Sequence, residues 1–327
     1  MSRVLVLNGK DVERLLEVDP LLEALEDAFR ALSAGRTSVP ARVAARTPDG
    51  LLGAMPGWVE GMGLASKLVT VFPGNAAEGL PSHQGLIVLF DDRTGTPAAI
   101  LDGERITALR TAAASAVAAR LLARPGSRVL AVLGAGVQGR AHLETVPSVL
   151  DLEEVRIASR SPEHAEVLAA EAPGILAASS VGDPPRVTMS SSFREAVRGA
   201  EVVCCCTDAR LPIVEDEWLA PGAHVGSVGG SAGREIDADT IYRGSVFVEW
   251  RGAVTAAPPA GAGELQGLDP DVVAELGEVL DGRRSGRRAD DELTVYKSTG
   301  HAVEDVAAAR LVVDRALEVG AGTTLEL

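Results

Sequence analysis

The sequence predicts an α/β protein that combines a doubly wound parallel sheet with a second, α+β domain. Its 327 residues exceed the length at which a single hydrophobic core usually stops growing, so two domains are expected. In the second half of the chain, short apolar runs alternate with helical stretches, which is typical of a parallel sheet covered by helices. A glycine-rich turn follows the first of those runs. The first half has a different pattern and predicts the second domain.

The first half of the chain predicts one long helix followed by an antiparallel meander. Asp19 and Pro20 supply an N-cap and a first-turn proline, and the apolar period that follows predicts a helix from Pro20 to Ala34. Turn-forming residues at Asp91–Gly95 separate two later strand candidates. An alanine-rich helix is expected at Glu104–Ala123. The meander strands are expected at Leu64–Phe72, Gly85–Phe90 and Pro97–Leu101.

The second half predicts strands that alternate with helices and a long helix at the end. The segment Thr255–Gly267 is rich in glycine, alanine and proline, and is expected to be a loop. The apolar residues of Gly300–Val319 recur at helical spacing and predict the last helix. Six parallel strands are expected at Arg128–Leu133, Val155–Ser159, Val187–Ser190, Val202–Cys206, Ala223–Val228 and Val246–Glu249.

A glycine motif predicts that this sheet is a Rossmann domain that binds a dinucleotide. The motif lies between an apolar strand and a helical stretch, and its residues are Gly134, Ala135, Gly136, Val137, Gln138 and Gly139. The first glycine permits a tight turn, the second lets pyrophosphate approach the backbone, and the third lets helix and strand pack closely. The helix N-terminus then faces the anion. The alternative is a glycine-rich turn that binds nothing.

The end of the next strand indicates which dinucleotide is bound. An NAD-binding domain usually carries Asp or Glu about 20 residues beyond the glycines. This chain has Ser159, Arg160 and Ser161 at that place. The arginine can pair with a 2′-phosphate and stack on adenine, and the serines can donate hydrogen bonds to the same phosphate. We therefore predict NADP(H) as the cofactor, with a solvated Arg160 that binds nothing as the alternative.

Composition and charge argue against several classes of function. The net charge of −15 opposes nucleic-acid binding, because such proteins need Lys and Arg to displace counterions from phosphates. The chain has no apolar run of about 18 residues, and its first residues turn acidic too soon for a signal peptide, so we expect a cytoplasmic protein without a membrane span. Scattered histidines argue against a metal site. The only cysteines, Cys204–Cys206, are consecutive in an apolar strand and are expected to be buried without a disulfide.

Three cations outside the glycine-motif domain are candidates for binding an anion, namely Arg42, Lys67 and Arg110. Lys67 lies within the apolar strand Leu64–Val69, where an unpaired ammonium would be costly, so we expect it to have an anionic partner. The alternative is a lysine on the wet face of an amphipathic strand.

Several segments, taken in order, resemble the ornithine cyclodeaminase and mu-crystallin family. Each segment alone is a weak signal, whereas the ordered set spans nearly the whole chain and is highly specific. The segments are Met55–Gly57, Ser66–Val69, Pro81–Gly85, Asp102-Gly103, Ile106–Ala108, Arg110–Ala112, the glycine motif, Glu275–Glu278, Lys297-Ser298, Gly300 and Ala302–Asp305.

The resemblance implies a homodimer and a division of the chain into two domains. Residues 1–115 with 298–327 would form a substrate-binding and dimerisation domain, and residues 116–297 the Rossmann domain. Arg42, Lys67 and Arg110 would hold a substrate carboxylate against the nicotinamide, because two or three charge-assisted hydrogen bonds of roughly 1.5–3 kcal/mol each can fix a small acid. Residues near the cofactor or the substrate would be His83, Gln84, Thr111, Thr207 and Ser298.

One position departs from the cyclodeaminases of this family. They carry an aspartate after a glycine pair that follows the fifth Rossmann strand, and this chain has Ser231 there, which we keep as a catalytic candidate. A hydroxyl cannot act as the general base that a carboxylate provides. In this respect the chain resembles the reductase-type members. We therefore predict NADP(H)-dependent reduction of a cyclic ketimine or another imino acid, with its C=N bond next to a carboxylate, to the amino acid.

Other assignments stay open at this point. The chain could instead be an NADP-linked amino-acid dehydrogenase, a non-catalytic NADPH-binding protein, or a cyclodeaminase in which Glu235 or Asp237 replaces the aspartate. His83 would either lie near the nicotinamide or form a hydrogen bond within a turn. His301 would either contribute to the choice of substrate or cap the last helix.

Overall fold

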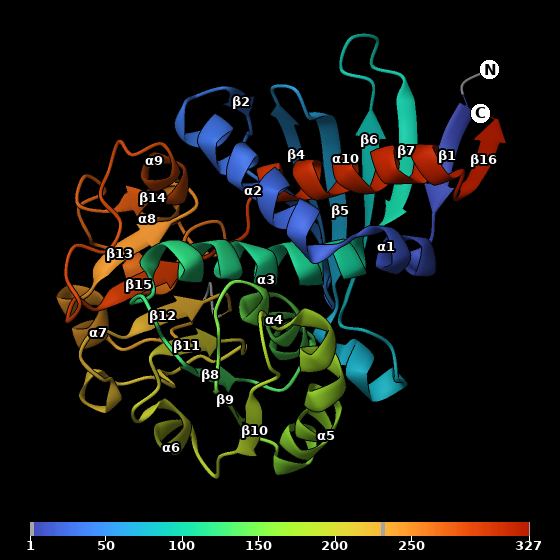
Figure 1. Cartoon of the computed structure of the whole chain (residues 1–327). Coiled ribbons are helices and arrows are strands. Elements are labelled where there is room, and N and C mark those ends of the chain that lie inside the picture. The colour runs from blue at the N-terminus through green and yellow to red at the C-terminus, as the bar shows by residue number, and fades with distance from the viewer. Residues whose placement is uncertain (1–2, 230–232, 327) are drawn as a thin grey trace. The chain divides into compact units, whose positions relative to one another are not determined.

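The structure, a computed structural model, describes residues 3–229 and 233–326 (Figure 1). The chain divides into two compact units, Met1–Arg110 with His301–Leu327 and Thr111–Gly300. Within the described residues each unit contains one eight-stranded sheet. Ser231, the catalytic candidate at the cyclodeaminase aspartate position, lies outside the described residues.

The sheet of the first unit is mainly antiparallel. Its strand order is β16-β1-β7-β6-β5-β4-β2, with β3 paired to β4. The predicted meander is confirmed, since β5, β6 and β7 pair antiparallel and the Gly95 N–H donates to the Asp91 carbonyl in the turn. The strands are β1 (Arg3–Leu7), β2 (Thr37–Ser38), β3 (Val43–Arg46), β4 (Leu51–Val59), β5 (Gly63–Val71), β6 (His83–Phe90), β7 (Pro97–Asp102) and β16 (Thr323–Glu326).

Helices α2 and α10 pack on one another, and α10 also contacts β4, β5 and β6, across which it runs in Figure 1. The predicted start of α2 is wrong, because Glu17 is the N-cap and Asp19 lies in the first turn, where the helix dipole favours a carboxylate. The alanine-rich helix and the last helix are confirmed as α3 and α10. The helices are α1 (Gly9–Leu15), α2 (Val18–Ser33), the 3-10 helix η1 (Pro73–Glu78), α3 (Gly103–Leu122, shared by both units) and α10 (Ala302–Val319).

The strands beneath α10 alternate between a buried and an outer face. Along β5, Ala65 and Lys67 are buried while Ser66 and Leu68 face outward. The neighbouring strands β4 and β6 follow the same period of two. Because Lys67 belongs to the buried set, its ammonium group lies in the core of the first unit.

The sheet of the second unit is parallel throughout, with strand order β10-β9-β8-β11-β12-β15-β13-β14. This is the doubly wound Rossmann sheet that the sequence predicts, and the order reverses at β8. Ligands bind at such a switch point, beyond the carboxyl ends of the strands. The strands are β8 (Val129–Leu133), β9 (Glu154–Ala158), β10 (Arg186–Met189), β11 (Val202–Cys205), β12 (His224–Ser227), β13 (Ser245–Val248), β14 (Ala274–Glu275) and β15 (Thr294–Lys297).

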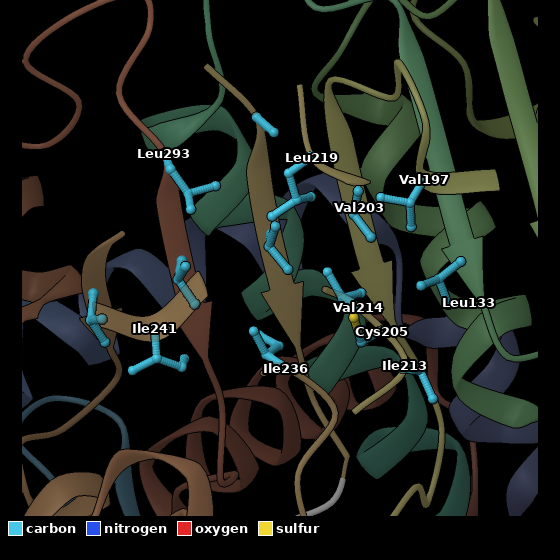
Figure 2. Close-up of a cluster of buried hydrophobic side chains, with 14 of the residues drawn as sticks. Leu133, Val197, Val203, Cys205, Ile213, Val214, Leu219, Ile236, Ile241 and Leu293 are labelled. Carbon is cyan, nitrogen blue, oxygen red and sulfur yellow. The ribbon is translucent and has the colours of Figure 1, made fainter. Parts of the chain in front are cut away.

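Two short elements contradict the loop expected at Thr255–Gly267, since its first residue ends α8 and η4 lies within it. The sequence also missed β14 and β15. The apolar core of this unit, shown in Figure 2, includes Leu133, Val203, Val214 and Ile236. The helices are α4 (Val137–Thr145), η2 (Val146–Ser148), α5 (Pro162–Ser179), α6 (Phe193–Val197), η3 (Asp216–Trp218), α7 (Ala238–Arg243), α8 (Gly252–Thr255), η4 (Gly263–Leu265) and α9 (Leu276–Leu280).

The three consecutive cysteines are buried and free, as predicted. Burial raises the pKa of the Cys204 thiol to about 12, so it stays protonated at neutral pH. None of the helices in residues 3–229 and 233–326 combines the length and the apolar character that a membrane crossing requires.

Candidate active site

Lys67 is paired with a carboxylate from the other end of the chain. Its Nζ lies 3.0 Å from Asp305 Oδ1 and 2.9 Å from Asp305 Oδ2, and it also donates to Thr107 Oγ1 at 3.5 Å. The residue is 3% exposed. The expected anionic partner is therefore Asp305, and the alternative of a lysine on a wet strand face is wrong.

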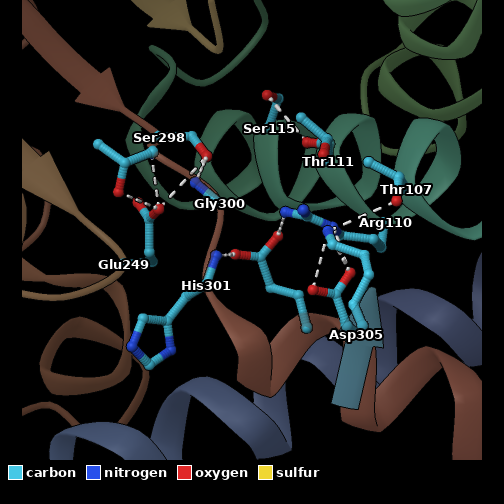
Figure 3. A network of polar contacts seen from close by, with 12 residues as sticks. Thr107, Arg110, Thr111, Ser115, Glu249, Ser298, Gly300, His301 and Asp305 are labelled. Atoms are coloured by element: carbon cyan, nitrogen blue, oxygen red, sulfur yellow. Dashed lines mark hydrogen bonds and ion pairs between the residues drawn. The ribbon is translucent and has the colours of Figure 1, made fainter. Parts of the chain in front are cut away.

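Arg110, on α3, binds two carboxylates of the first turn of α10 (Figure 3). Its Nε donates to Asp305 Oδ1 at 3.1 Å and its Nη1 to Glu304 Oε2 at 2.6 Å. The other oxygen of Glu304 accepts the backbone N–H of His301 at 2.7 Å. Carboxylates in a first turn are also stabilised by the positive end of the helix dipole. Glu304 and Asp305 belong to a segment that carries the family resemblance, but the sequence did not indicate that they bind these cations.

Arg42 lies near enough to Asp305 and His301 to lower the pKa of both. All three predicted cations of the first unit therefore gather around Asp305. Lys67 and Arg110 share the carboxylate of Asp305, Arg110 also binds Glu304, and Arg42 lies close enough to act on Asp305 electrostatically. A gathering of cations in a mostly buried place suits the binding of a small carboxylate.

The titration of this group follows from its burial. Burial, followed by the neighbouring Arg110, lowers the pKa of Lys67 to about 8. Burial alone would raise the pKa of Asp305, but Arg110 and Lys67 outweigh it and the net shift is downward. Burial, with Arg42 adding to it, lowers the pKa of His301 to about 4, so this side chain is neutral at pH 7. His301 occupies the N-cap position of α10, as one of the two readings of the sequence expected.

The glycine motif of the second unit fits a dinucleotide. Gly134 has φ +113°, which favours glycine, and a Cβ there would lie 2.5 Å from the Cys206 carbonyl oxygen. A Cβ on Gly139 would overlap the Gly134 carbonyl, whereas one on Gly136 would meet open space. Gly136 is also the N-cap of α4 and brings no side chain to the helix N-terminus, where first-turn N–H groups lack intrahelical partners. The open approach and the exposed N–H groups together suit a pyrophosphate.

The residues expected to select NADP(H) follow β9. Ser159 Oγ accepts the Ser161 N–H at 3.2 Å, and Arg160 is exposed. Ser161 is the N-cap of α5, accepts the His164 N–H at 3.2 Å, and donates to Glu163 Oε2 at 2.7 Å. The hydrogen bond from Ser161 lowers the pKa of Glu163. Ser161 thus has a structural role as a cap, and the sequence reasoning missed the carboxylate beside it.

Three other candidates belong to the second unit. Thr207, after β11, donates from its backbone N–H and its Oγ1 to Glu235 Oε1, at 2.7 and 2.6 Å. Ser298, after β15, donates to Glu249 Oε1 at 3.4 Å and accepts the Gly300 N–H at 3.1 Å. The carbonyl of Thr111 accepts the Ser115 hydroxyl at 3.4 Å.

Two more candidates, His83 and Gln84, are exposed residues at the start of β6 in the first unit. His83 Nδ1 lies 3.0 Å from Ser82 Oγ, which is the local turn contact that one reading of the sequence expected. The role of either residue near a cofactor stays a prediction.

The two carboxylates considered as substitutes for the cyclodeaminase aspartate both make structural contacts. Glu235 is fully buried and accepts hydrogen bonds from Thr207, Ser227 and Gly229. Asp237 is the N-cap of α7 and accepts the Thr240 N–H at 3.0 Å. These contacts argue against a catalytic role for either one.

Comparison with known proteins gives matches over nearly the whole length. Residues 3–320 match the model of the ornithine cyclodeaminase/mu-crystallin family. The chain is 40% identical over 307 residues to the ketimine reductase mu-crystallin of Mus musculus. These aligned residues cover 91% of this chain and 91% of that protein.

Two solved structures are also similar to this one. The Δ1-pyrroline-2-carboxylate reductase of Thermococcus litoralis, in complex with NADH and L-proline, has a TM-score of 0.90 and 34% identity, covering 98% of this chain and 99% of that one. An archaeal alanine dehydrogenase dimer with bound NAD has a TM-score of 0.88 and 30% identity, covering 99% of each chain. Sequence and structure agree, and the chain belongs to the ornithine cyclodeaminase/mu-crystallin family.

Proposed function

We propose that this protein is a reductase that uses a nicotinamide dinucleotide to reduce the C=N bond of a cyclic ketimine, or of another imino acid, to the amino acid. The observation that carries the proposal is the gathering of Arg42, Lys67 and Arg110 around Asp305. Relatives that this chain matches over 91% and 99% of their length are a ketimine reductase and a Δ1-pyrroline-2-carboxylate reductase, respectively. In this proposal the first unit binds the substrate and the second unit binds the cofactor.

The chain's own residues would orient the substrate. Lys67 and Arg110 donate charge-assisted hydrogen bonds to its carboxylate, and Asp305 keeps both donors in one geometry before the substrate arrives. The carboxylates of Glu304 and Asp305 also reduce the repulsion between these cations and a protonated imine nitrogen. The bound nicotinamide supplies the hydride.

The reductase is tested by screening cyclic imino acids while following oxidation of NADPH or NADH. Lys67→Ala should raise the KM for the imino acid by roughly 10- to 100-fold, because one charge-assisted hydrogen bond of about 1.5–3 kcal/mol is lost. Its Kd for the cofactor should stay unchanged. Lys10→Ala, which removes an exposed lysine, is the control and should match the wild type. An unchanged KM in Lys67→Ala would remove Lys67 from the site, and absence of turnover with every imino acid would contradict the reductase.

We also propose that the cofactor is NADP(H), on the basis of Ser159 and Arg160 at the end of β9. Arg160→Ala should lower kcat/KM for NADPH by about 10-fold or more and leave NADH within about twofold, because only NADPH carries the 2′-phosphate. Arg186→Ala, which removes an exposed arginine at the start of β10, is the control. A wild-type preference for NADH would contradict this choice.

We further propose a homodimer formed through the outer face of the first unit's sheet. Val43 pairs with Ala54, Ala54 with Leu68, and Leu68 with Leu86, so these residues form one row across four strands. Val43, Leu68 and Leu86 are exposed, and apolar side chains that lie together on a surface can mark an interface. A second copy of the chain is the proposed occupant, since the similar alanine dehydrogenase is a dimer.

Sedimentation analysis tests the dimer. The wild type should sediment as a dimer and Leu86→Asp as a monomer, because a carboxylate would be buried without a partner at the interface. Leu317→Asp is the matched control, since it alters an exposed leucine of α10, and it should remain dimeric. A monomeric wild type, or a dimeric Leu86→Asp, contradicts the proposed interface.

The likeness to an alanine dehydrogenase favours one second candidate, reductive amination of a 2-oxo acid. The same cationic group would hold the carboxylate of the oxo acid. Oxidation of the reduced cofactor would then require ammonia in addition to the oxo acid, whereas a preformed cyclic imine needs none. Turnover that depends on ammonia would therefore favour the dehydrogenase.

A further inference from the structure

Three charged side chains of the second unit are buried together and contact Ser227, at the carboxyl end of β12. Glu235 and Lys297 are fully buried, and Glu264 is 8% exposed. They belong to segments far apart in the sequence, namely the stretch after β12, the end of β15 and the 3-10 helix η4. Buried charges are tolerated where they are paired and form several hydrogen bonds. The contacts of these three side chains therefore show which parts of the main chain they hold in place.

The carboxylate of Glu235 joins the ends of two neighbouring strands. Its Oε1 accepts the N–H and the hydroxyl of Thr207, which follows β11, at 2.7 and 2.6 Å. Its Oε2 accepts the Ser227 hydroxyl at 2.7 Å and the Gly229 N–H at 3.0 Å, both from the end of β12. One side chain thereby fixes the positions of both turns.

Glu264 and Lys297 hold Glu235 in place. Glu264 Oε2 accepts the backbone N–H of Glu235 at 2.9 Å, and its Oε1 lies 3.0 Å from Lys297 Nζ. Lys297 also donates to the Ser227 hydroxyl at 2.8 Å and to the carbonyl of Gly229. The opposite charges of Lys297 and Glu264 compensate each other, and the remaining contacts fix the main chain around Glu235.

Close packing connects these turns to the glycine motif. A Cβ on Gly229 would overlap the Thr207 carbonyl oxygen, and a Cβ on Gly134 would collide with the Cys206 carbonyl. The Cys206-Thr207 turn is therefore packed between Gly134 on one side and Gly229 on the other. All of these turns lie at the carboxyl ends of parallel strands, which is the edge where open α/β sheets bind their ligands.

We propose that Glu235 is a positioning residue for the dinucleotide. Its carboxylate, supported by Glu264 and Lys297, keeps the Cys206-Thr207 turn in the place that the glycine motif needs, so that the affinity for the cofactor depends on a side chain that never touches it. The inference rests on the cofactor binding that the proposed function includes.

The substitution Glu235→Gln tests this role with little change in size. The four donors are divided equally between the two carboxylate oxygens, and the amide replaces one oxygen with an NH₂ donor. One of the two turns must therefore lose its acceptor. We expect the Kd for NADPH and for NADH, titrated by fluorescence without substrate, to rise by about 10-fold or more, since a misplaced turn costs on the order of one hydrogen bond or more.

Glu201→Gln is the matched control, because Glu201 accepts the N–H groups of Arg128 and Val129 at 2.5 and 3.2 Å at the opposite, amino-terminal edge of the same sheet. Both variants should unfold at lower urea concentration, but Glu201→Gln should keep its Kd within about twofold of the wild type. Glu235→Asp retains two carboxylate oxygens and should recover part of the affinity that Glu235→Gln loses.

A Glu235→Gln variant that loses stability but binds both dinucleotides like the wild type would overturn the inference. If that variant does not fold, Ser227→Ala applies the same criterion, since this hydroxyl contacts Glu235, Glu264 and Lys297. The result is independent of turnover. A wild type that binds NADPH but reduces no imino acid contradicts the proposed function alone, whereas active wild type with unaltered binding in Glu235→Gln contradicts the inference alone.

Discussion

Lys67 and Asp305 are separated by 238 positions in the sequence, yet Lys67 Nζ lies 2.9 Å from Asp305 Oδ2 in the core of the first unit. The contact joins β5 to the first turn of α10 and places two opposite charges where each alone would be costly. Arg110 binds the same carboxylate at 3.1 Å. Asp305 is therefore the centre around which the candidate carboxylate site is built.

Asp305→Asn should lower the free energy of unfolding by about 3 kcal/mol or more, because it leaves Lys67 and Arg110 buried without their shared counter-charge. Asp314→Asn is the matched control on the same helix. It breaks a half-exposed pair with Arg310 and should cost at most about 1 kcal/mol. Urea denaturation monitored by circular dichroism measures both values, and equal stabilities of the two variants would contradict the central role of Asp305.

The kcat/KM for the imino acid should fall as the pH rises through about 8. Burial lowers the pKa of Lys67 to that value, and the neutral amine above it binds a carboxylate less well. Lys67→Arg keeps its charge to much higher pH and should lose this alkaline limb, which separates the titration of Lys67 from that of the imine itself. An identical limb in the variant would assign it to the substrate.

The same shift affects stability in the opposite direction. Between pH 8 and the ordinary lysine value of 10.5, the unfolded chain binds a proton at Lys67 that the folded chain does not. The contribution of Lys67 to the free energy of unfolding therefore rises with pH across that window. Comparing the wild type with Lys67→Met by urea denaturation at several pH values should show a steeper rise for the wild type.

Two glycines of the cofactor motif should respond differently to alanine. Gly136 has open space where a Cβ would be placed, so Gly136→Ala should fold with the stability of the wild type while its methyl group obstructs the pyrophosphate. We expect its Kd for NADPH to rise by about 10-fold or more. Gly139→Ala should instead destabilise the fold, because its Cβ would overlap the Gly134 carbonyl. Normal cofactor binding by Gly136→Ala would contradict the assigned approach of the pyrophosphate.

Acid should weaken the second unit through a buried histidine. His142, on α4, contacts the Gln138 carbonyl at 2.7 Å and Ser115 Oγ at 3.0 Å, and burial lowers its pKa from 6.5 to about 4. Between those values the unfolded chain binds more protons, so the free energy of unfolding falls as the pH falls from 6.5 towards 4.

Measured by urea denaturation between pH 6.5 and 5, His142→Gln should reduce that slope by up to about 1.4 kcal/mol per pH unit. His164→Gln, which removes an exposed histidine of α5, is the control and should keep the slope of the wild type. A slope unchanged in His142→Gln would show that other groups cause the acid sensitivity.

Local signals in the sequence were enough to predict much of the fold and part of the site. The glycine motif, the meander β5–β7 and the alternating strands of the second unit depend on turns, periodicity and backbone freedom within a few residues, and these are readable in one segment at a time. Where the local signal was ambiguous, the prediction failed. Glu17 rather than Asp19 caps α2, and η4 interrupts the expected loop.

The partners of the charged residues were decided only by the tertiary structure. Sequence reasoning could state that Lys67 needs an anion, because burying a lone ammonium is costly, but periodicity does not indicate which carboxylate arrives from 238 positions away. The same holds for β15, which inserts between β12 and β13, and for Lys297 and Glu264, which meet because that strand lies there. Residues close together in the sequence determine the helices and strands and show which buried charges need a partner. The packing of distant helices and strands determines which residue becomes that partner.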